Sequence, residues 1–263
     1  MFKGFPWSRR INKSIGCVLD QQDLNPVHSY YYNKPIINKL GTGILNGQEL
    51  FVSGFYFRYH ENDTCISNHL KEGILFEKFI LSFIQQYIDP VKNILDIGAN
   101  IGIHSVVYAN YVSTGKVYAF EPQPVVFNLL KQNLEINNCK NVIPFNYGAS
   151  NKNDVFFMNA HYDSKDNQGA FRICENNNID GIYINCKILD ELNLENIGFV
   201  KMDVEGHEFE ALQGLLNTLK KCKPRILIEI HESSPTKEQV FLLLQGLGYI
   251  KYIRLTHCDY LFI

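Results

Sequence analysis

Several features are absent from this sequence of 263 residues, and each absence excludes a class of protein. No apolar run reaches the roughly 18 residues that a transmembrane helix needs. Lys and Arg number 25 against 27 Asp and Glu, so the net charge of -2 offers no large positive field to a nucleic acid or an anionic membrane. A local basic groove is still compatible with this total charge. The basic N-terminal residues are not followed by the apolar segment of a secretory signal. We therefore expect a cytoplasmic protein with no membrane partner, and nucleic acid is disfavoured as a ligand.

The seven cysteines lack the spacing of a metal-binding motif. No two of them lie close enough in the sequence to form a metal knuckle, so we expect free, buried thiols. The hydrophobic content of 46% and the aromatic content of 13% are enough to bury a core, as one domain with an extension or as two small domains. We predict an N-terminal extension with a strand or hairpin over residues 1–70 and a larger domain over residues 71–263.

From about residue 91 onwards, short β-branched or aromatic runs alternate with segments of helical periodicity. This alternation predicts an α/β fold in which helices connect the strands of a mostly parallel sheet. The last two strands are separated by too few residues for a parallel crossover, so the final strand must be antiparallel. The seven predicted strands are Asn93 to Ile97, Lys116 to Phe120, Val142 to Asn146, Phe199 to Val204, Arg225 to Ile230, Tyr249 to Arg254 and Cys258 to Ile263.

Apolar residues at helical spacing predict the helices that pack on this sheet. Two such apolar faces consist of Val125, Val126, Leu129, Leu130 and Leu134, and of Phe209, Leu212, Leu215, Leu216 and Leu219. A third helix should begin with Ser234 as its cap and Pro235 in its first turn. A fourth helix, within residues 73–88, should pack on the sheet just before its first strand.

Two segments do not follow this alternation of strands and helices. Residues 49–60 alternate apolar and polar side chains, which predicts a half-buried strand or hairpin with Phe51, Ser53, Phe55, Phe57 and Tyr59 on one side. Residues 159–181 are polar and contain glycine, and a loop of that length is usually either functional or disordered. We expect this segment and the N-terminal strand to form the acceptor side of the binding site, because the main sheet alone supplies little wall above a ligand cleft.

The segment ILDIGANIG places Gly98 and Gly102 between a buried strand and a helix that begins near Ile103. Glycines at such a turn let the backbone approach a ligand closely, and the free N–H groups of the helix start face that ligand. Glu121, at the end of the next strand, is placed to accept hydrogen bonds from both ribose hydroxyls of a nucleoside. A tight turn with close helix packing would also explain the glycines, but together with Glu121 they predict a nucleoside cofactor.

Two nucleoside cofactors compete for this turn. Sites for NAD have a third glycine, so that the pyrophosphate lies on the helix N-terminus, and this turn lacks it. Asp96, just before the first glycine, is unsuited to a pyrophosphate, but it can order the turn or, directly or through water, hold an ammonium group. S-adenosylmethionine has such an ammonium group and NAD does not, so S-adenosylmethionine is the predicted cofactor.

Four segments together resemble the FkbM-type methyltransferases, a branch of the class I S-adenosylmethionine-dependent enzymes. They are NILDIGANIGIHSVVYA, VYAFEPQPVVFNLLKQNLEIN, GFVKMDVEGHEFEALQG and KPRILIEIH, and the resemblance covers residues 71–263. It implies the Rossmann-like class I fold, which agrees with the antiparallel last strand. It also implies O-methylation of a hydroxyl group on a sugar, glycan or glycoside-like acceptor.

Further residues near the turn are candidate contacts for the cofactor. Small residues after the third strand suit a flat adenine base. His104 lies in the helix after the glycines, where packing is the alternative role, and Glu77 matches an acidic position of the family, with a solvated surface position as the alternative. The predicted cofactor-binding set is Glu77, Asp96, Gly98, Ala99, Asn100, Gly102, His104, Glu121, Pro122, Gly148, Ala149, Ser150 and Asp203.

Carboxylates and an imidazole follow two neighbouring strands, where the groups nearest a transferred methyl group should lie. O-methylation requires a group that takes the hydroxyl proton, and the predicted catalytic residues are Asp203, Glu205, Glu229 and His231. Capping of the next helix would explain Glu208 and part of Glu205. Glu229 could instead turn to the opposite face, and for His231 the roles of general base, metal ligand and loop residue stay open.

A divalent metal is the alternative to a metal-independent base. Asp203, Glu229 and His231 offer ligands that Mg²⁺ or Mn²⁺ accepts, but the metal-independent base is preferred. For the whole chain, one alternative function is methylation of a nucleic-acid ribose or cap, disfavoured because no basic stretch with interleaved aromatic residues is present. The other is a non-catalytic cofactor-binding module, disfavoured because Asp96, Glu121 and Asp203 are all retained.

Overall fold

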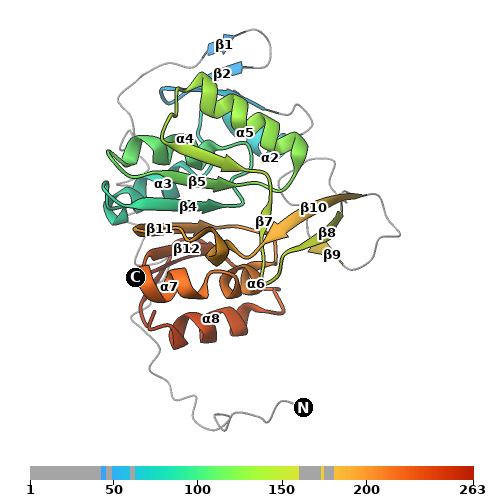
Figure 1. The fold of residues 1–263 in the computed structure, drawn as a ribbon. Helices are drawn as coiled ribbons and strands as arrows, with labels where there is room; N and C mark the ends of the chain where they lie inside the picture. Colours follow the sequence, from blue (N-terminus) through green and yellow to red (C-terminus); the bar gives the residue numbers. More distant parts are fainter. Residues whose placement is uncertain (1–42, 46–48, 60–62, 160–172, 175–180) are drawn as a thin grey trace, which may run out of the picture.

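The computed structural model describes residues 43–45, 49–59, 63–159, 173–174 and 181–263. A seven-stranded sheet crosses the molecule, with helices on both of its faces (Figure 1). In spatial order its strands are β13 (Tyr252–Arg254), β14 (Asp259–Phe262), β12 (Arg225–Glu229), β11 (Ile197–Met202), β4 (Asn93–Ile97), β5 (Val117–Phe120) and β6 (Val142–Phe145). All seven predicted strands are present.

The direction of one strand distinguishes this sheet from a fully parallel one. β14 is antiparallel to both of its neighbours, β12 and β13, whereas the other adjacent pairs are parallel. The α/β fold with an antiparallel last strand is therefore confirmed. Because β14 runs antiparallel to β12, its first residues lie at the edge of the sheet at which the parallel strands end.

Each face of the sheet is covered by its own set of helices and its own core (Figure 1). Ile94 and Phe199 pack on one face with α3 (Lys78–Ile84), α4 (Ile103–Tyr111) and α5 (Pro124–Ile136). Leu95 and Val200 pack on the opposite face with α6 (Glu208–Gln213), α7 (Leu216–Cys222) and α8 (Lys237–Gly246). Strand side chains alternate between faces, so neighbouring residues enter different cores. Within the described part of the chain, no helix combines the length and apolar character that crossing a membrane requires.

Four helix predictions need correction. α3 begins at Lys78 rather than near residue 73, because Glu77 has a left-handed backbone with φ of 53°. The helix predicted across Phe209 to Leu219 is divided into α6 and α7 at Gly214, where a Cβ atom would lie 2.0 Å from the Ser150 carbonyl oxygen. α8 begins after Thr236, so Ser234 is not its cap. In α5, Val126, Leu130 and Leu134 are buried as predicted, but Val125 is 60% exposed.

The N-terminal segment forms the predicted hairpin, with a different buried face. β1 (Gly43–Leu45), β2 (Glu49–Val52) and β3 (Phe55–Arg58) make a three-stranded antiparallel sheet, which α2 (Thr64–Lys71) follows. Ser53 and Gly54 have φ of 52° and 95°, as the two central residues of a tight hairpin turn require. This turn puts Leu50, Val52, Phe55 and Phe57 on the buried side, so Phe51 and Ser53 were assigned to the wrong face.

Asn133 in α5 and Asn137 at its C-terminal cap hold this hairpin against the larger domain. Asn137 accepts a hydrogen bond from the Tyr56 N–H and donates one to the Tyr56 carbonyl, and Asn133 does the same with Arg58. Asn133 also donates to the carbonyl of Ile101, in the glycine turn. The side chains thus replace the strand that would otherwise pair with β3.

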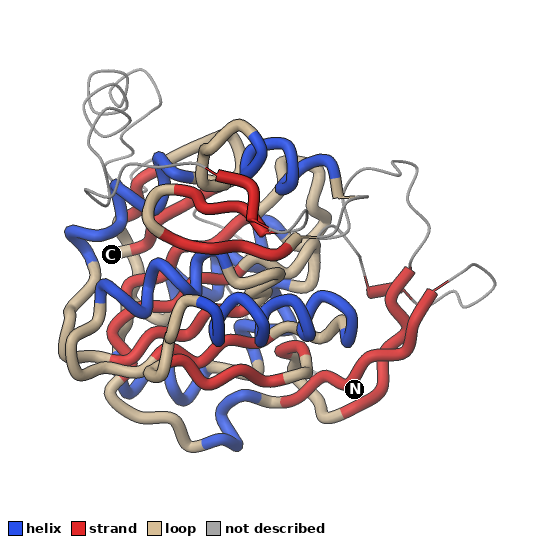
Figure 2. The backbone as a smooth tube through the Cα atoms, turned by 90° about the horizontal axis from the view of Figure 1, so that it is seen from above, coloured by secondary structure: helices blue, strands red, loops and turns tan. Residues whose placement is uncertain are grey.

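A second, smaller sheet was not predicted. β7 (Gly148–Ala149), β10 (Gly181–Lys187), β8 (Asp154–Asn159) and β9 (Ile173–Cys174) lie side by side in this order, and the sheet extends away from the body of the molecule (Figure 2). β9 falls within the segment 159–181 that was treated as a loop. Residues 160–172 and 175–180 of that segment lie outside the described residues.

Candidate functional site

The glycine turn between β4 and α4 has the close approach that the sequence predicts. Gly98 has φ of +78°, and a Cβ atom there would lie 1.7 Å from the carbonyl oxygen of Asp203. Gly102 has φ of +89°, and its added Cβ would lie 2.5 Å from Leu130 Cδ1, so this glycine serves helix packing. Asn100 also has a left-handed backbone, with φ of 50°. The turn therefore brings the end of β4 against the end of β11.

Glu121 is anchored to this turn by its carboxylate. Its Oε2 accepts a hydrogen bond of 3.0 Å from the Asn100 N–H, and its Oε1 accepts one of 2.8 Å from the Gln123 N–H. The residue is 5% exposed, and burial raises the pKa of Glu121 to about 7 against the opposing effect of the two hydrogen bonds. Each oxygen keeps a lone pair that can accept one more hydrogen bond.

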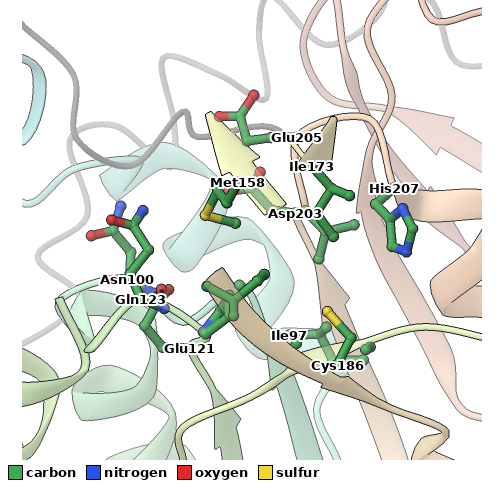
Figure 3. Close-up of a pocket in the computed structure, with 16 residues that line it drawn as sticks. Ile97, Asn100, Glu121, Gln123, Met158, Ile173, Cys186, Asp203, Glu205 and His207 are labelled. Carbon is green, nitrogen blue, oxygen red and sulfur yellow. Dashed lines mark hydrogen bonds between the residues drawn. The ribbon is translucent and has the colours of Figure 1, made fainter. Parts of the chain in front are cut away.

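A cleft opens beside Glu121, and we call its first part the apolar lobe (Figure 3). It encloses about 590 Å³, including space open to solvent. The small sheet supplies much of its apolar wall, which consists of Ala149, Met158, Ile173, Ile184 and Cys186. The remaining lining residues are Ile97, Gly98, Asn100, Glu121, Pro122, Gln123, Gly148, Asp203, Val204, Glu205 and His207. Apolar side chains of the small sheet and residues of the glycine turn therefore line the same lobe.

The second part of the cleft, the charged lobe, shares Gly98, Asn100 and Asp203 with the first. It encloses about 320 Å³, and its other ionisable lining residues are Glu77, His104 and Lys201. Ile66, Phe76, Ala99, Ile101 and Ile103 complete the lining. The His104 Nε2 atom lies 3.0 Å from Glu77 Oε2. The two lobes therefore adjoin at Gly98, Asn100 and Asp203, with the apolar lobe on one side and the charged lobe on the other.

Lys201 is the buried cation of the charged lobe, and it was missing from the predicted set. Its Nζ donates to the Gly98 carbonyl at 2.8 Å and to Asp203 Oδ2 at 3.3 Å, and it lies 3.9 Å from Asp96 Oδ1. Burial opposes its charge, but Asp203, Asp96 and Glu77 together hold the pKa of Lys201 above its ordinary value. It thus stays protonated and joins the ends of β4 and β11.

Asp96 lies behind the cleft rather than in its wall. It is fully buried, and its Oδ2 accepts a hydrogen bond of 2.5 Å from Ser105 Oγ in α4. Asp96 pairs with Lys201 across β4 and β11, on the face covered by α4. Of the two roles considered from the sequence, this position favours ordering the turn over contact with an ammonium group.

Carboxyl groups from three strand ends meet beside the charged lobe. Asp203 follows β11, Glu229 ends β12 and Asp259 begins β14. Burial, and then the charges of Asp203 and Asp259, raise the pKa of Glu229 to about 9. Burial also acts against ionisation of Asp203, but the charge of Lys201 and a hydrogen bond with Glu229 hold the pKa of Asp203 below its ordinary value. Near neutral pH, Glu229 therefore holds a proton that it donates to ionised Asp203.

His231 and Cys258 contact the far side of the same carboxyl group. The His231 Nε2 atom lies 3.6 Å from Glu229 Oε1 and 3.8 Å from Glu205 Oε2. The Cys258 Sγ donates to Glu229 Oε1 at 3.0 Å. Since 36% of the His231 side chain is exposed, Glu229 connects the partly buried Asp203 to a group at the solvent edge.

The raised pKa of Glu229 predicts a pH-dependent stability. Because the folded state holds a proton that the unfolded state releases above about pH 4.5, the free energy of unfolding should fall as pH rises from 5 toward 9. Glu229→Gln cannot ionise and should flatten this fall, with a gain over wild type on the order of a few kcal/mol at pH 8.5. Urea unfolding at pH 5 and 8.5 measures it. Equal slopes for wild type and Glu229→Gln would contradict the assignment, and Glu135→Gln, on the exposed side of α5, is the control.

The predicted site residues divide into two groups by position. Those that line the cleft are Glu77, Gly98, Ala99, Asn100, His104, Glu121, Pro122, Gly148, Ala149, Asp203 and Glu205. Those that line neither lobe are Asp96, Gly102, Ser150, Glu229 and His231. Ser150 is buried behind the wall, where its Oγ lies 3.0 Å from His207 Nε2. Glu208 accepts a hydrogen bond from the Gly206 N–H at 2.7 Å, as helix capping predicts.

Sequence reasoning missed several residues of the cleft. Lys201 had a detectable signal, because a lysine within the apolar strand FVKM needs a buried partner for its charge. His207 was not among the predicted residues, and the structure places it in the apolar lobe. Met158, Ile184 and Cys186 had no local signal, since they reach the cleft only through the unpredicted small sheet.

Comparison with known proteins identifies the family. The hexuronic acid methyltransferase AglP of Haloferax volcanii is 29% identical over 153 residues, which cover 57% of this chain and 61% of that protein. Methyltransferase sdnD of Sordaria araneosa is 26% identical over 190 residues, covering 59% and 73%. The crystal structure of methyltransferase FkbM from Methylobacillus flagellatus matches at 17% identity with a TM-score of 0.47, over 67% of this chain and 44% of that one. The chain thus matches less than two thirds of the first relative's length. The family model of the methyltransferase FkbM domain matches residues 96–251, and the chain therefore belongs to this methyltransferase family.

Proposed function

We propose that this chain transfers a methyl group from S-adenosylmethionine to a hydroxyl group of a sugar or glycan acceptor. The observation that carries the proposal is the pair of adjoining lobes, which share Gly98, Asn100 and Asp203, with Glu121 bordering the apolar lobe and ionisable side chains lining the other. S-adenosylmethionine has the same division, with a flat adenine at one end and a charged amino-acid group at the other. Membership of the methyltransferase family supports this assignment.

The residues of the apolar lobe suit the nucleoside. The wall of Met158, Ile173 and Ile184 offers an apolar surface to the adenine base. The remaining lone pairs of Glu121 can accept hydrogen bonds from the two ribose hydroxyls. Gly98 leaves the space beside Asp203 that a side chain would fill, so the backbone there can approach the cofactor.

The charged lobe suits the amino-acid end and the reaction. Glu77 and Asp203 offer carboxylates to an ammonium group, and Lys201 keeps Asp203 ionised. When bound, the cofactor supplies the methyl group, whose bond to sulfur breaks as its bond to the acceptor oxygen forms. Asp203 can receive the hydroxyl proton, because it lines both lobes and is 29% exposed at its side chain. Glu229 and His231 then provide a route for a proton to solvent.

The charge of the site favours a neutral acceptor. Glu77, Asp203, Glu205 and Glu229 lie in or beside the charged lobe, and a carboxylate acceptor would be repelled by those that are ionised. A neutral hydroxyl needs a proton acceptor, which these groups supply. The name of the relative from Haloferax volcanii, a hexuronic acid methyltransferase, supports a sugar acceptor, although a hexuronic acid carries a carboxylate and so differs in charge from the neutral acceptor that this site favours. Release of S-adenosylhomocysteine with a panel of neutral and acidic glycosides tests the acceptor class.

Cofactor binding is the first experiment. Calorimetric titration should show binding of S-adenosylmethionine and S-adenosylhomocysteine in the low micromolar range, and no measurable binding of NAD. Glu121→Ala should weaken S-adenosylhomocysteine binding by roughly 1–3 kcal/mol, about 5- to 150-fold in Kd, since it removes charge-assisted hydrogen bonds from a buried site. Glu135→Ala, an exposed carboxylate of α5, is the matched control. Binding of NAD alone would refute the proposal, and unchanged affinity in Glu121→Ala would remove Glu121 from the ribose.

A further inference from the structure

The antiparallel strand β14 brings a third type of side chain to the strand-end cluster. Glu229 at the end of β12 pairs with Asp259 at the start of β14, so Cys258 lies beside the Glu229 carboxyl group. His231 follows two residues after Glu229. In the described part of the chain, one ligand atom from each of Glu229, His231 and Cys258 lies within 4.8 Å of the other two. A parallel final strand would have placed Cys258 at the opposite edge of the sheet.

The distances within this group are compatible with coordination of one ion. Glu229 Oε1 lies 3.0 Å from Cys258 Sγ and 3.6 Å from His231 Nε2. Zinc binds thiolate at about 2.3 Å and imidazole or carboxylate at about 2.0–2.2 Å, so an ion between the three atoms needs them about 3–4 Å apart. The ligand atoms of Cys258 and His231 lie within 4.8 Å of each other, so coordination requires the imidazole, which is 36% exposed, to move toward the thiol.

The types of ligand determine the class of metal. A thiolate and an imidazole are ligands for zinc and related transition metals, whereas Mg²⁺ prefers oxygen ligands. The set considered from the sequence, Asp203, Glu229 and His231, pointed instead to Mg²⁺ or Mn²⁺. In the structure the Asp203 carboxylate accepts a hydrogen bond from Lys201, whereas Cys258 donates to the Glu229 carboxyl group. Cys258 therefore replaces Asp203 as the third candidate ligand.

We propose that Glu229, His231 and Cys258 form a binding site for a transition-metal ion of the zinc class. Glu205, whose Oε2 lies 3.8 Å from His231 Nε2, is placed to supply a fourth ligand or to hold a water there. The neighbouring carboxyl groups of Asp203 and Asp259 favour a dipositive ion at this position. This inference goes beyond the proposed methyl transfer and does not depend on it.

Binding of the ion changes the protonation state of its ligands. Because zinc coordinates the thiolate, binding of the ion releases the thiol proton of Cys258 to the buffer. Affinity should therefore rise from pH 6 to pH 8. A loaded site also withdraws Glu229 and His231 from any proton transfer that begins at Asp203.

The test is metal binding by the whole chain after treatment with a chelator and its removal by dialysis. Zn²⁺ is titrated by calorimetry in two buffers of different ionisation enthalpy, which counts the released protons, and Co²⁺ binding is followed by absorption. We expect one Zn²⁺ per chain with a Kd in the micromolar range or below, and a thiolate-to-cobalt charge-transfer band in the near ultraviolet. Cys258→Ser should abolish this band and weaken Zn²⁺ binding at least about 100-fold, and His231→Ala should weaken it similarly.

Cys222→Ser, which removes a partly exposed thiol at the end of α7, is the control and should retain the band. Circular dichroism and thermal unfolding establish that each variant is folded. The proposal is overturned if wild type binds no Zn²⁺, or if Cys258→Ser binds Zn²⁺ as tightly as wild type does. Titration of S-adenosylhomocysteine in the same preparations tests the proposed function separately, so the two can fail independently.

Discussion

Replacing Asp203 by asparagine is expected to lower the turnover number by at least about 100-fold at saturating cofactor and acceptor, the usual share of a general base. Asp203 lines both lobes of the cleft, and Lys201 and Glu229 hold its carboxylate in the ionised form. Asparagine has a similar shape but cannot accept the proton of an acceptor hydroxyl. The rate is measured as S-adenosylhomocysteine formed with the best acceptor from the glycoside panel.

Two comparisons separate loss of the base from loss of structure. Asp154→Asn removes an exposed carboxylate, 50% accessible at its side chain, and should leave the rate near that of wild type. Calorimetric titration of Asp203→Asn with S-adenosylhomocysteine measures how much Asp203 also contributes to cofactor binding. His231→Ala should slow turnover with little change in cofactor affinity, because His231 lines neither lobe. A rate for Asp203→Asn within a few-fold of wild type would exclude Asp203 as the base.

The base mechanism also predicts the response to chelation. We expect EDTA to leave most of the activity intact, since Asp203 needs Lys201 and Glu229 rather than an ion to act as base. Full, reversible loss of activity on chelation, restored by added metal, would reject this mechanism. Glu229 and His231 would then act as ligands of a catalytic metal.

The main sheet was predictable because its signals are local. Each buried strand is a short apolar run, and the few residues between β13 and β14 exclude a parallel connection. The small sheet was missed because β7 and β9 contain only two residues each, and β8 and β10 pair across the segment 160–180. The assigned face of the hairpin was wrong because the Ser53–Gly54 turn reverses the alternation, a change that depends on backbone geometry.

The same distinction applies to the candidate site. Gly98, Glu121 and Asp203 were found because they occupy fixed places at strand ends, and the structure puts all three in the cleft wall. Cys258 and Asp259 could not be placed, since they reach Glu229 only because β14 lies between β12 and β13. Sequence patterns thus identify a site residue when its place at the end of one strand is enough to predict its role. Contacts between residues of different strands depend on the order of the strands in the sheet, which only the structure shows.

Lys201→Met is expected to lower the free energy of unfolding by about 3–5 kcal/mol, the cost of breaking a buried ion pair from one side. Methionine retains the length of the side chain, but Asp96 and Asp203 lose the cation that Lys201 provides, and the Gly98 carbonyl loses its donor. Urea unfolding at pH 7 measures the loss. The loss should shrink as pH falls, because protonation of Asp203 removes part of the uncompensated charge.

A surface pair and a double variant test this explanation. Lys221→Met removes an exposed lysine that is 2.6 Å from Glu195, and it should leave stability close to that of wild type, because exposed ion pairs are screened by solvent. Adding Asp96→Asn to Lys201→Met removes one of the unpaired charges and should recover part of the lost stability. If the double variant is no more stable than Lys201→Met, the loss arises from packing around the side chain. Lys201 would then not be the cation that holds the carboxylates of β4 and β11 together.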